Sequence, residues 1–60
     1  MAYTREDLDT QINSDETLSQ YIINSTLHFY NEVATREELD VLSDEEVNDL
    51  VEHFDMLWDK

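Results

Sequence analysis

The chain has 60 residues, of which 16 are Asp or Glu and three are Lys or Arg, so its formal net charge is −13. This length allows one domain, spanning residues 1–60, which buries only about 60% of the surface that its unfolded chain exposes. The absence of cysteine excludes disulfides, and the acidic balance excludes the basic surface needed for direct binding to nucleic acid or to an anionic membrane.

The segment from Met1 to Asp7 is polar and has no apolar stretch typical of a signal peptide. No uncharged run contains the roughly 18 apolar residues of a membrane span. We therefore expect a cytoplasmic protein, located in the host cytoplasm if a phage encodes it.

The sequence contains neither glycine nor proline, which favours short loops and an all-α fold. Four hydroxyl residues are placed to cap helices, because a hydroxyl can accept a hydrogen bond from a free N–H of the first turn. They are Thr4, Ser14, Thr35 and Ser43. We predict helices over residues 5–12, 15–33, 36–42 and 44–58, with Asn13 as a left-handed end of the first.

Residues 4–9 and 35–40 are similar in sequence, and each stretch is soon followed by Ser-Asp-Glu and a long amphipathic segment. Either a short-helix, long-helix unit is used twice, or two capping sequences have converged. Both explanations predict a small helical bundle of two short-helix/long-helix hairpins with about four helices.

The stretch 17–31 carries no charged side chain and is expected to be the central helix. Its apolar residues form two stripes at helical spacing. The first stripe consists of Leu18, Tyr21, Ile22, Phe29 and Val33, and the second of Ile23, Leu27 and Tyr30. The first is expected to face the last helix. The second either packs internally or forms the seam of a homodimer.

The last predicted helix separates apolar from acidic residues. Its core face consists of Val47, Leu50, Val51, Phe54, Leu57 and Trp58. The opposite side carries Glu45, Asp49, Glu52, Asp55 and Asp59, with Met56 as its apolar exception.

Metal binding and catalysis find little support in the sequence. The acids from Asp7 to Asp15 are spaced as in a calcium loop, but Ile12 stands where that loop needs glycine and Leu18 where it needs glutamate. Without cysteine or glycine there is no thiol nucleophile, phosphate-binding loop or nucleophile elbow. We expect no metal, no cofactor and no enzymatic activity.

The acids are more numerous than solubility requires, since a net charge of about 2–8 suffices for a small domain. Carboxylates on adjacent turns follow the helix pitch of about 5.4 Å, and side-chain splay brings this close to the spacing of phosphates in a nucleic-acid strand. The sequence therefore predicts a DNA-mimic inhibitor. The expected contacts are Glu37, Glu38, Asp44, Glu45, Asp49, Glu52, Asp55 and Asp59.

The expected partner is a basic nucleic-acid-binding protein: a nuclease, a restriction enzyme, a CRISPR effector or a nucleoid protein. Such inhibitors are typical of phage and mobile-element counter-defence and host takeover. One alternative is an interaction module or accessory subunit that docks, or dimerises, through Ile23, Leu27 and Tyr30, while the acids serve only solubility. Another is an ordinary small domain adapted to high salt.

Overall fold

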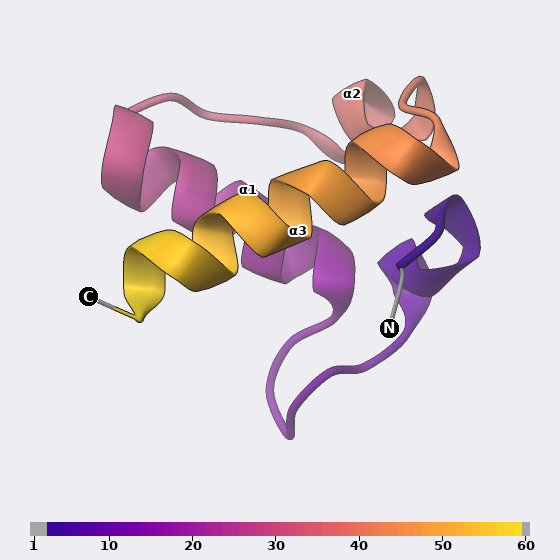
Figure 1. Cartoon of the computed structure of the whole chain (residues 1–60), viewed down its shortest axis with the longest axis horizontal. Coiled ribbons are helices and arrows are strands. Elements are labelled where there is room, and N and C mark those ends of the chain that lie inside the picture. Colours follow the sequence, from indigo (N-terminus) through magenta and orange to yellow (C-terminus); the bar gives the residue numbers. More distant parts are fainter. Residues whose placement is uncertain (1–2, 60) are drawn as a thin grey trace.

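Four helical elements follow one another in the computed structural model, which describes residues 3–59 (Figure 1). They are the 3-10 helix η1 (Arg5–Asp9) and the α-helices α1 (Leu18–Tyr30), α2 (Arg36–Asp40) and α3 (Asp44–Trp58). The described residues contain no strand, only an isolated antiparallel bridge between Gln11 and Thr17. The prediction of an all-α fold is confirmed.

The central helix α1 is shorter than predicted at both ends. Thr17, rather than Ser14, caps its start: the Thr17 hydroxyl accepts from the N–H of Gln20, and the Gln20 side chain accepts from the N–H of Thr17. The side chain of Asn13 accepts from the N–H groups of Asp15 and Glu16, which holds residues 13–16 in a turn instead of a first helical turn.

The left-handed residue is also not the predicted one. Asn31, with φ 55° and ψ 36°, ends α1, whereas Asn13 acts through its side chain. Asn tolerates this conformation better than most residues. The helix consequently ends before Val33, which the sequence had placed on its core stripe.

The other boundaries follow the capping chemistry more closely. α3 spans the predicted residues 44–58, and Ser43 and Glu46 form the expected reciprocal capping box. Thr35 caps α2, which stops at Asp40 rather than at residue 42. The first element is a short 3-10 helix that ends at Asp9, because Thr10 is already extended.

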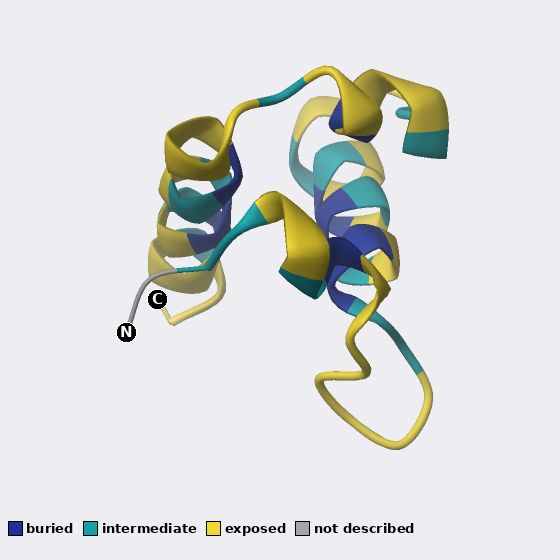
Figure 2. Cartoon of the chain, turned by 90° about the vertical axis from the view of Figure 1, so that its right-hand side faces the viewer, coloured by how far each residue is buried: buried dark blue, intermediate teal, exposed yellow. Residues whose placement is uncertain are grey.

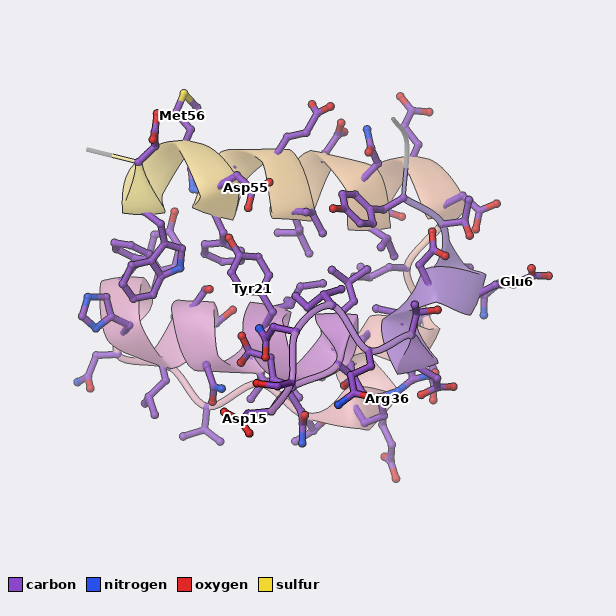
Figure 3. All side chains as sticks on the ribbon, turned by 90° about the horizontal axis from the view of Figure 1, so that it is seen from below. Glu6, Asp15, Tyr21, Arg36, Asp55 and Met56 are labelled. Atoms are coloured by element: carbon purple, nitrogen blue, oxygen red, sulfur yellow. The ribbon has the colours of Figure 1, made fainter. Side chains whose placement is uncertain are left out.

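The two long helices run in the same general direction and cross obliquely (Figures 1 and 3). After α1 ends, the segment 31–35 returns along the length of the molecule to α2 (Figure 1). Both short elements, η1 and α2, therefore lie toward the N-terminal ends of the long helices. The C-terminal ends of α1 and α3 lie together on the other side.

The core fills the space between α1 and α3 and is covered at one end by η1 and α2 (Figure 2). Its buried apolar residues are Leu8, Leu18, Ile22, Leu39, Val47, Val51 and Phe54. Tyr21, Ile23, Phe29, Leu50 and Leu57 pack against these residues and are partly buried. Val33 does not join them, because it lies beyond α1 and is 77% exposed.

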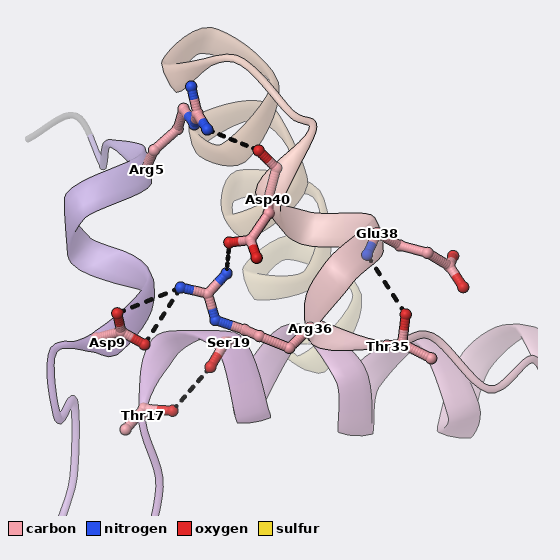
Figure 4. Close-up of polar contacts among 8 residues, drawn as sticks. All are labelled: Arg5, Asp9, Thr17, Ser19, Thr35, Arg36, Glu38 and Asp40. Carbon is pink, nitrogen blue, oxygen red and sulfur yellow. Dashed lines mark hydrogen bonds and ion pairs between the residues drawn. The ribbon is translucent and has the colours of Figure 1, made fainter.

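The two similar stretches contact each other through their arginines and last aspartates (Figure 4). Arg5 donates to the backbone carbonyl oxygen of Asp40 at 2.6 Å, and Arg36 pairs with the carboxylate of Asp9 at 3.2 Å. Arg36 also pairs with Asp40 on its own helix. The corresponding leucines, Leu8 and Leu39, are both buried. The sequence repeat thus has a structural counterpart: each arginine contacts the aspartate of the other copy.

Candidate partner-binding surface

The outer side of α3 carries a row of carboxylates. Val47, Val51 and Phe54 point into the core, so helical periodicity turns Glu45, Asp49, Glu52 and Asp59 toward solvent. Met56 lies within this row, is 59% exposed and projects away from α1 (Figure 3). No Lys or Arg occurs between residues 44 and 59. The row is therefore acidic along the whole helix, with one apolar interruption.

All eight predicted contact residues are exposed. The carboxylates of three of them also accept intramolecular hydrogen bonds. Asp44 accepts from the N–H of Arg5, Glu52 from the side chain of Asn48, and Asp55 from the hydroxyl of Tyr21. Asp55 accordingly lies at the edge of the row that faces α1, where Figure 3 shows it above Tyr21.

Carboxylates are not confined to α2 and α3. Fourteen of the 16 acids are exposed, and they occur on η1, α2 and α3 and in the connecting segments, but not on α1. Glu6 on η1 and Asp15 in the 10–17 loop, for example, point outward from other parts of the surface (Figure 3). What distinguishes the α3 row is that its helix carries no Lys or Arg, whereas Arg5 and Arg36 both lie at the junction of η1 with α2.

Tyr21 and Asp55 form a hydrogen-bonded pair that changes the pKa of Tyr21. The Tyr21 hydroxyl lies 2.6 Å from the Asp55 carboxylate. Partial burial raises the pKa of the Tyr21 phenol well above its usual value, and the hydrogen bond to Asp55 and the negative charge of Asp55 raise it further. The neutral phenol is thereby held as a donor that orients Asp55 on α3.

The predicted second stripe of the central helix is only partly at the surface. Leu27 is 48% and Tyr30 51% exposed, whereas Ile23 is partly buried against the core. Tyr30 is also hydrogen-bonded to His53 of α3, and their rings are stacked. Leu27 and Tyr30 therefore remain available to a partner, and Ile23 serves chiefly internal packing.

Trp58 was expected in the core but is 48% exposed. Its ring is nevertheless fixed: Nε1 donates to the buried Ser25 hydroxyl at 2.9 Å, and the His28 ring stacks on it at a centroid distance of 4.6 Å. His28 is exposed and covers one face of the indole. In the sequence, the one indication of this contact is Ser25, a hydroxyl residue on the otherwise apolar side of the central helix.

Trp58 lines two shallow hollows. One is lined by Asp55, Met56, Trp58 and Asp59. The other is lined by Glu16, Tyr21, Asn24, Ser25 and Trp58. Each hollow combines at least one carboxylate with an aromatic ring.

Within residues 3–59, no group of three or more His, Asp or Glu side chains is placed to hold a metal ion. None of the helices in that range is long and apolar enough to cross a membrane. Comparisons of the chain with protein-family models, with curated proteins and with solved structures found no match.

Proposed function

We propose that this protein is an inhibitor that occupies the nucleic-acid site of a basic partner protein through the outer side of α3. The observation that carries this proposal is the exposed row formed by Glu45, Asp49, Glu52 and Asp59, which contains no cation. The row is a property of a single rigid element and does not depend on loop conformation. Glu37, Glu38 and Asp44 extend the negative field beyond its N-terminal end.

The dimensions of the row suit contact with several cations. From Glu45 to Asp59 the helix axis rises by about 21 Å. Five carboxylates, counting Asp55, give one negative charge in about 5 Å, compared with about 3.4 Å per phosphate along one DNA strand. A channel of Lys and Arg that binds DNA would meet a comparable, somewhat sparser series of charges here. Association would be fast and electrostatically steered.

The partner class follows from the same chemistry. A nuclease, a restriction enzyme, a CRISPR effector or a nucleoid protein has the required basic channel. The proposed role is counter-defence or host takeover by a phage or mobile element, in the cytoplasm of the host. No catalytic step and no cofactor is part of this proposal.

The test is capture of partners from a bacterial lysate at low salt, followed by competition with duplex DNA. A true partner should be released by duplex DNA, and its affinity should fall by more than about tenfold between about 50 and 200 mM salt. A variant with Asp49→Lys and Glu52→Lys should not bind it. A control with Glu6→Lys and Asp15→Lys changes the net charge equally on other surfaces and should retain most of the affinity. Equal losses in both variants would contradict a contact through α3.

A second candidate function rests on the exposed apolar residues near the C-terminal end of α1. Leu27, Tyr30 and Val33 are each about half or more exposed, which suits a docking module or a homodimer. The affinity of binding through this apolar surface should depend little on salt concentration, and Leu27→Asp should abolish binding. Analytical ultracentrifugation at low and high salt separates a homodimer from a docking surface for another protein.

A further inference from the structure

The C-terminal end of α3 combines features that the acidic row alone does not have. Trp58 has 48% of its surface exposed, yet its indole is held by Ser25 and stacked against His28. The Phe29 ring meets it edge-on, at a centroid distance of 4.7 Å and an interplanar angle of 65°. The ring is therefore a fixed, partly exposed aromatic surface rather than a mobile side chain.

Two carboxylates stand beside this ring on the same helix. Asp55 and Asp59 are four residues apart, so their Cβ atoms are about 6 Å from each other on adjacent turns. Both line the same hollow as Trp58, together with the exposed thioether of Met56. Asp55 is further oriented by the Tyr21 hydroxyl, which occupies one of its oxygens and leaves the other open to a ligand.

This arrangement matches the guanidinium group of arginine. A guanidinium is planar, stacks on an aromatic face, and offers N–H donors on two edges to carboxylates. A lysine ammonium would find the same charge, but it has neither the flat face for the indole nor the two edges for the two aspartates.

We propose that the hollow bounded by Asp55, Met56, Trp58 and Asp59 is the anchoring site for an arginine side chain of the partner protein. The inference relies on the proposed function only in taking the partner to be basic. It adds a specific contact, stacking on Trp58 between two carboxylates, to a surface that otherwise attracts cations through its overall field.

Trp58 is the single tryptophan of the sequence, so its fluorescence reports on this site without knowledge of the partner. The probe is a blocked peptide Ser-Arg-Ser, titrated against the full chain beside the matched peptide Ser-Lys-Ser. The arginine peptide should change the Trp58 emission saturably and bind at least about threefold more tightly than the lysine peptide. Equal affinity of the two peptides, or a linear change without saturation, would overturn the proposal.

Two isosteric variants separate the site from the general field of the protein. Asp59→Asn should weaken the arginine peptide by about fivefold, while Asp49→Asn, with the same loss of charge at a distance on α3, should weaken it less than twofold. Equal losses of affinity for the arginine peptide in the two variants would overturn the proposed site. Circular dichroism of both variants confirms that each is folded.

A third variant tests the ring itself. Trp58→Leu should lose the preference for arginine over lysine, as measured by calorimetry. A retained preference would also overturn the proposal. If the peptide binds as expected but captured partners ignore duplex DNA, the anchoring site stands and the proposed DNA-mimic function fails.

Discussion

The hydroxyl of Tyr21 donates to the carboxylate of Asp55 over 2.6 Å, which joins the first turns of α1 to the last turns of α3. The two residues lie 34 positions apart in the sequence. The contact links the stability of the helix pair to the position of a carboxylate at the proposed partner surface, so a single proton on Tyr21 affects both.

Stability should therefore depend on the Tyr21 proton at alkaline pH. Burial, the hydrogen bond to Asp55 and its charge raise the pKa of Tyr21 in the folded protein above the ordinary value of about 10. The folded state thus holds this proton more tightly than the unfolded chain. The resulting contribution is fully present below about pH 10 and is lost as pH rises through the higher folded pKa.

Tyr21→Phe tests this dependence. Near neutral pH the free energy of unfolding of the variant should be about 0.5–1.5 kcal/mol lower than that of the parent, because one hydrogen bond is lost. This difference should shrink as the pH is raised above about 10, when measured by urea unfolding. Tyr3 and Tyr30 are present in both proteins, so the comparison isolates Tyr21. A difference that stays constant up to about pH 12 would contradict the assignment.

The core offers a matched pair of valines. Val47 is 0% exposed, between α1 and α3, whereas Val41 is 81% exposed in the connection before α3. Val47→Ala should lower the unfolding free energy by about 2–3 kcal/mol, which is a large share of the total for a chain of this size. Val41→Ala should change it by less than about 0.5 kcal/mol. Thermal unfolding followed by circular dichroism measures both free energies. Similar losses in the two variants would contradict the burial of Val47 in the core.

The start of α1 can be tested through its two candidate caps. Thr17→Ala removes the hydroxyl that accepts from Gln20 and should destabilise the protein by about 1 kcal/mol. Ser14→Ala should have almost no effect, because the hydrogen bond made by Ser14 uses its backbone carbonyl. Chemical denaturation of the two variants decides between them. A larger loss of stability for Ser14→Ala than for Thr17→Ala would instead support a start of α1 at residue 15, as the sequence pattern predicts.

The contact between the two similar stretches should be measurable but small. The side chains of Arg36 and Asp9 are 36% and 82% exposed, and exposed ion pairs contribute about 0.2–1 kcal/mol. A double-mutant cycle of Arg36→Gln and Asp9→Asn should give a coupling energy in this range that decreases with salt. Arg36→Gln with Glu37→Gln is the control cycle, and it should give almost no coupling.

The last helix was predictable because several local signals agree. Ser43 and Glu46 form a capping box directly before the apolar series that begins with Val47. The central helix has two hydroxyl residues, Ser14 and Thr17, at suitable distances from the apolar run. The choice between them depends on the turn made by Asn13, which local helix signals do not reveal.

Tertiary contacts account for the remaining differences. Helical periodicity places Trp58 on the core face of α3, but it is the final residue of the helix, so no following turn covers it. Its contact with Ser25 and the pairing of Arg36 with Asp9 join residues far apart in the chain. The exposure of the predicted acidic residues followed from charge alone, whereas the orientation of the Trp58 ring beside the hollow depends on its hydrogen bond to Ser25 of α1.

The common direction of α1 and α3 has a consequence for approach at long range. The peptide dipoles of two helices that run the same way reinforce each other, with about half an elementary charge of negative sign at each C-terminal end. The arginines sit toward the opposite ends. His28 in the last turn of α1 stacks on Trp58 at the end of α3, so the negative ends of both helix dipoles lie close to this ring and to the carboxylates of Asp55 and Asp59. A cation within about 10 Å of Trp58 at physiological salt is therefore attracted by the peptide groups of two helices as well as by the aspartates.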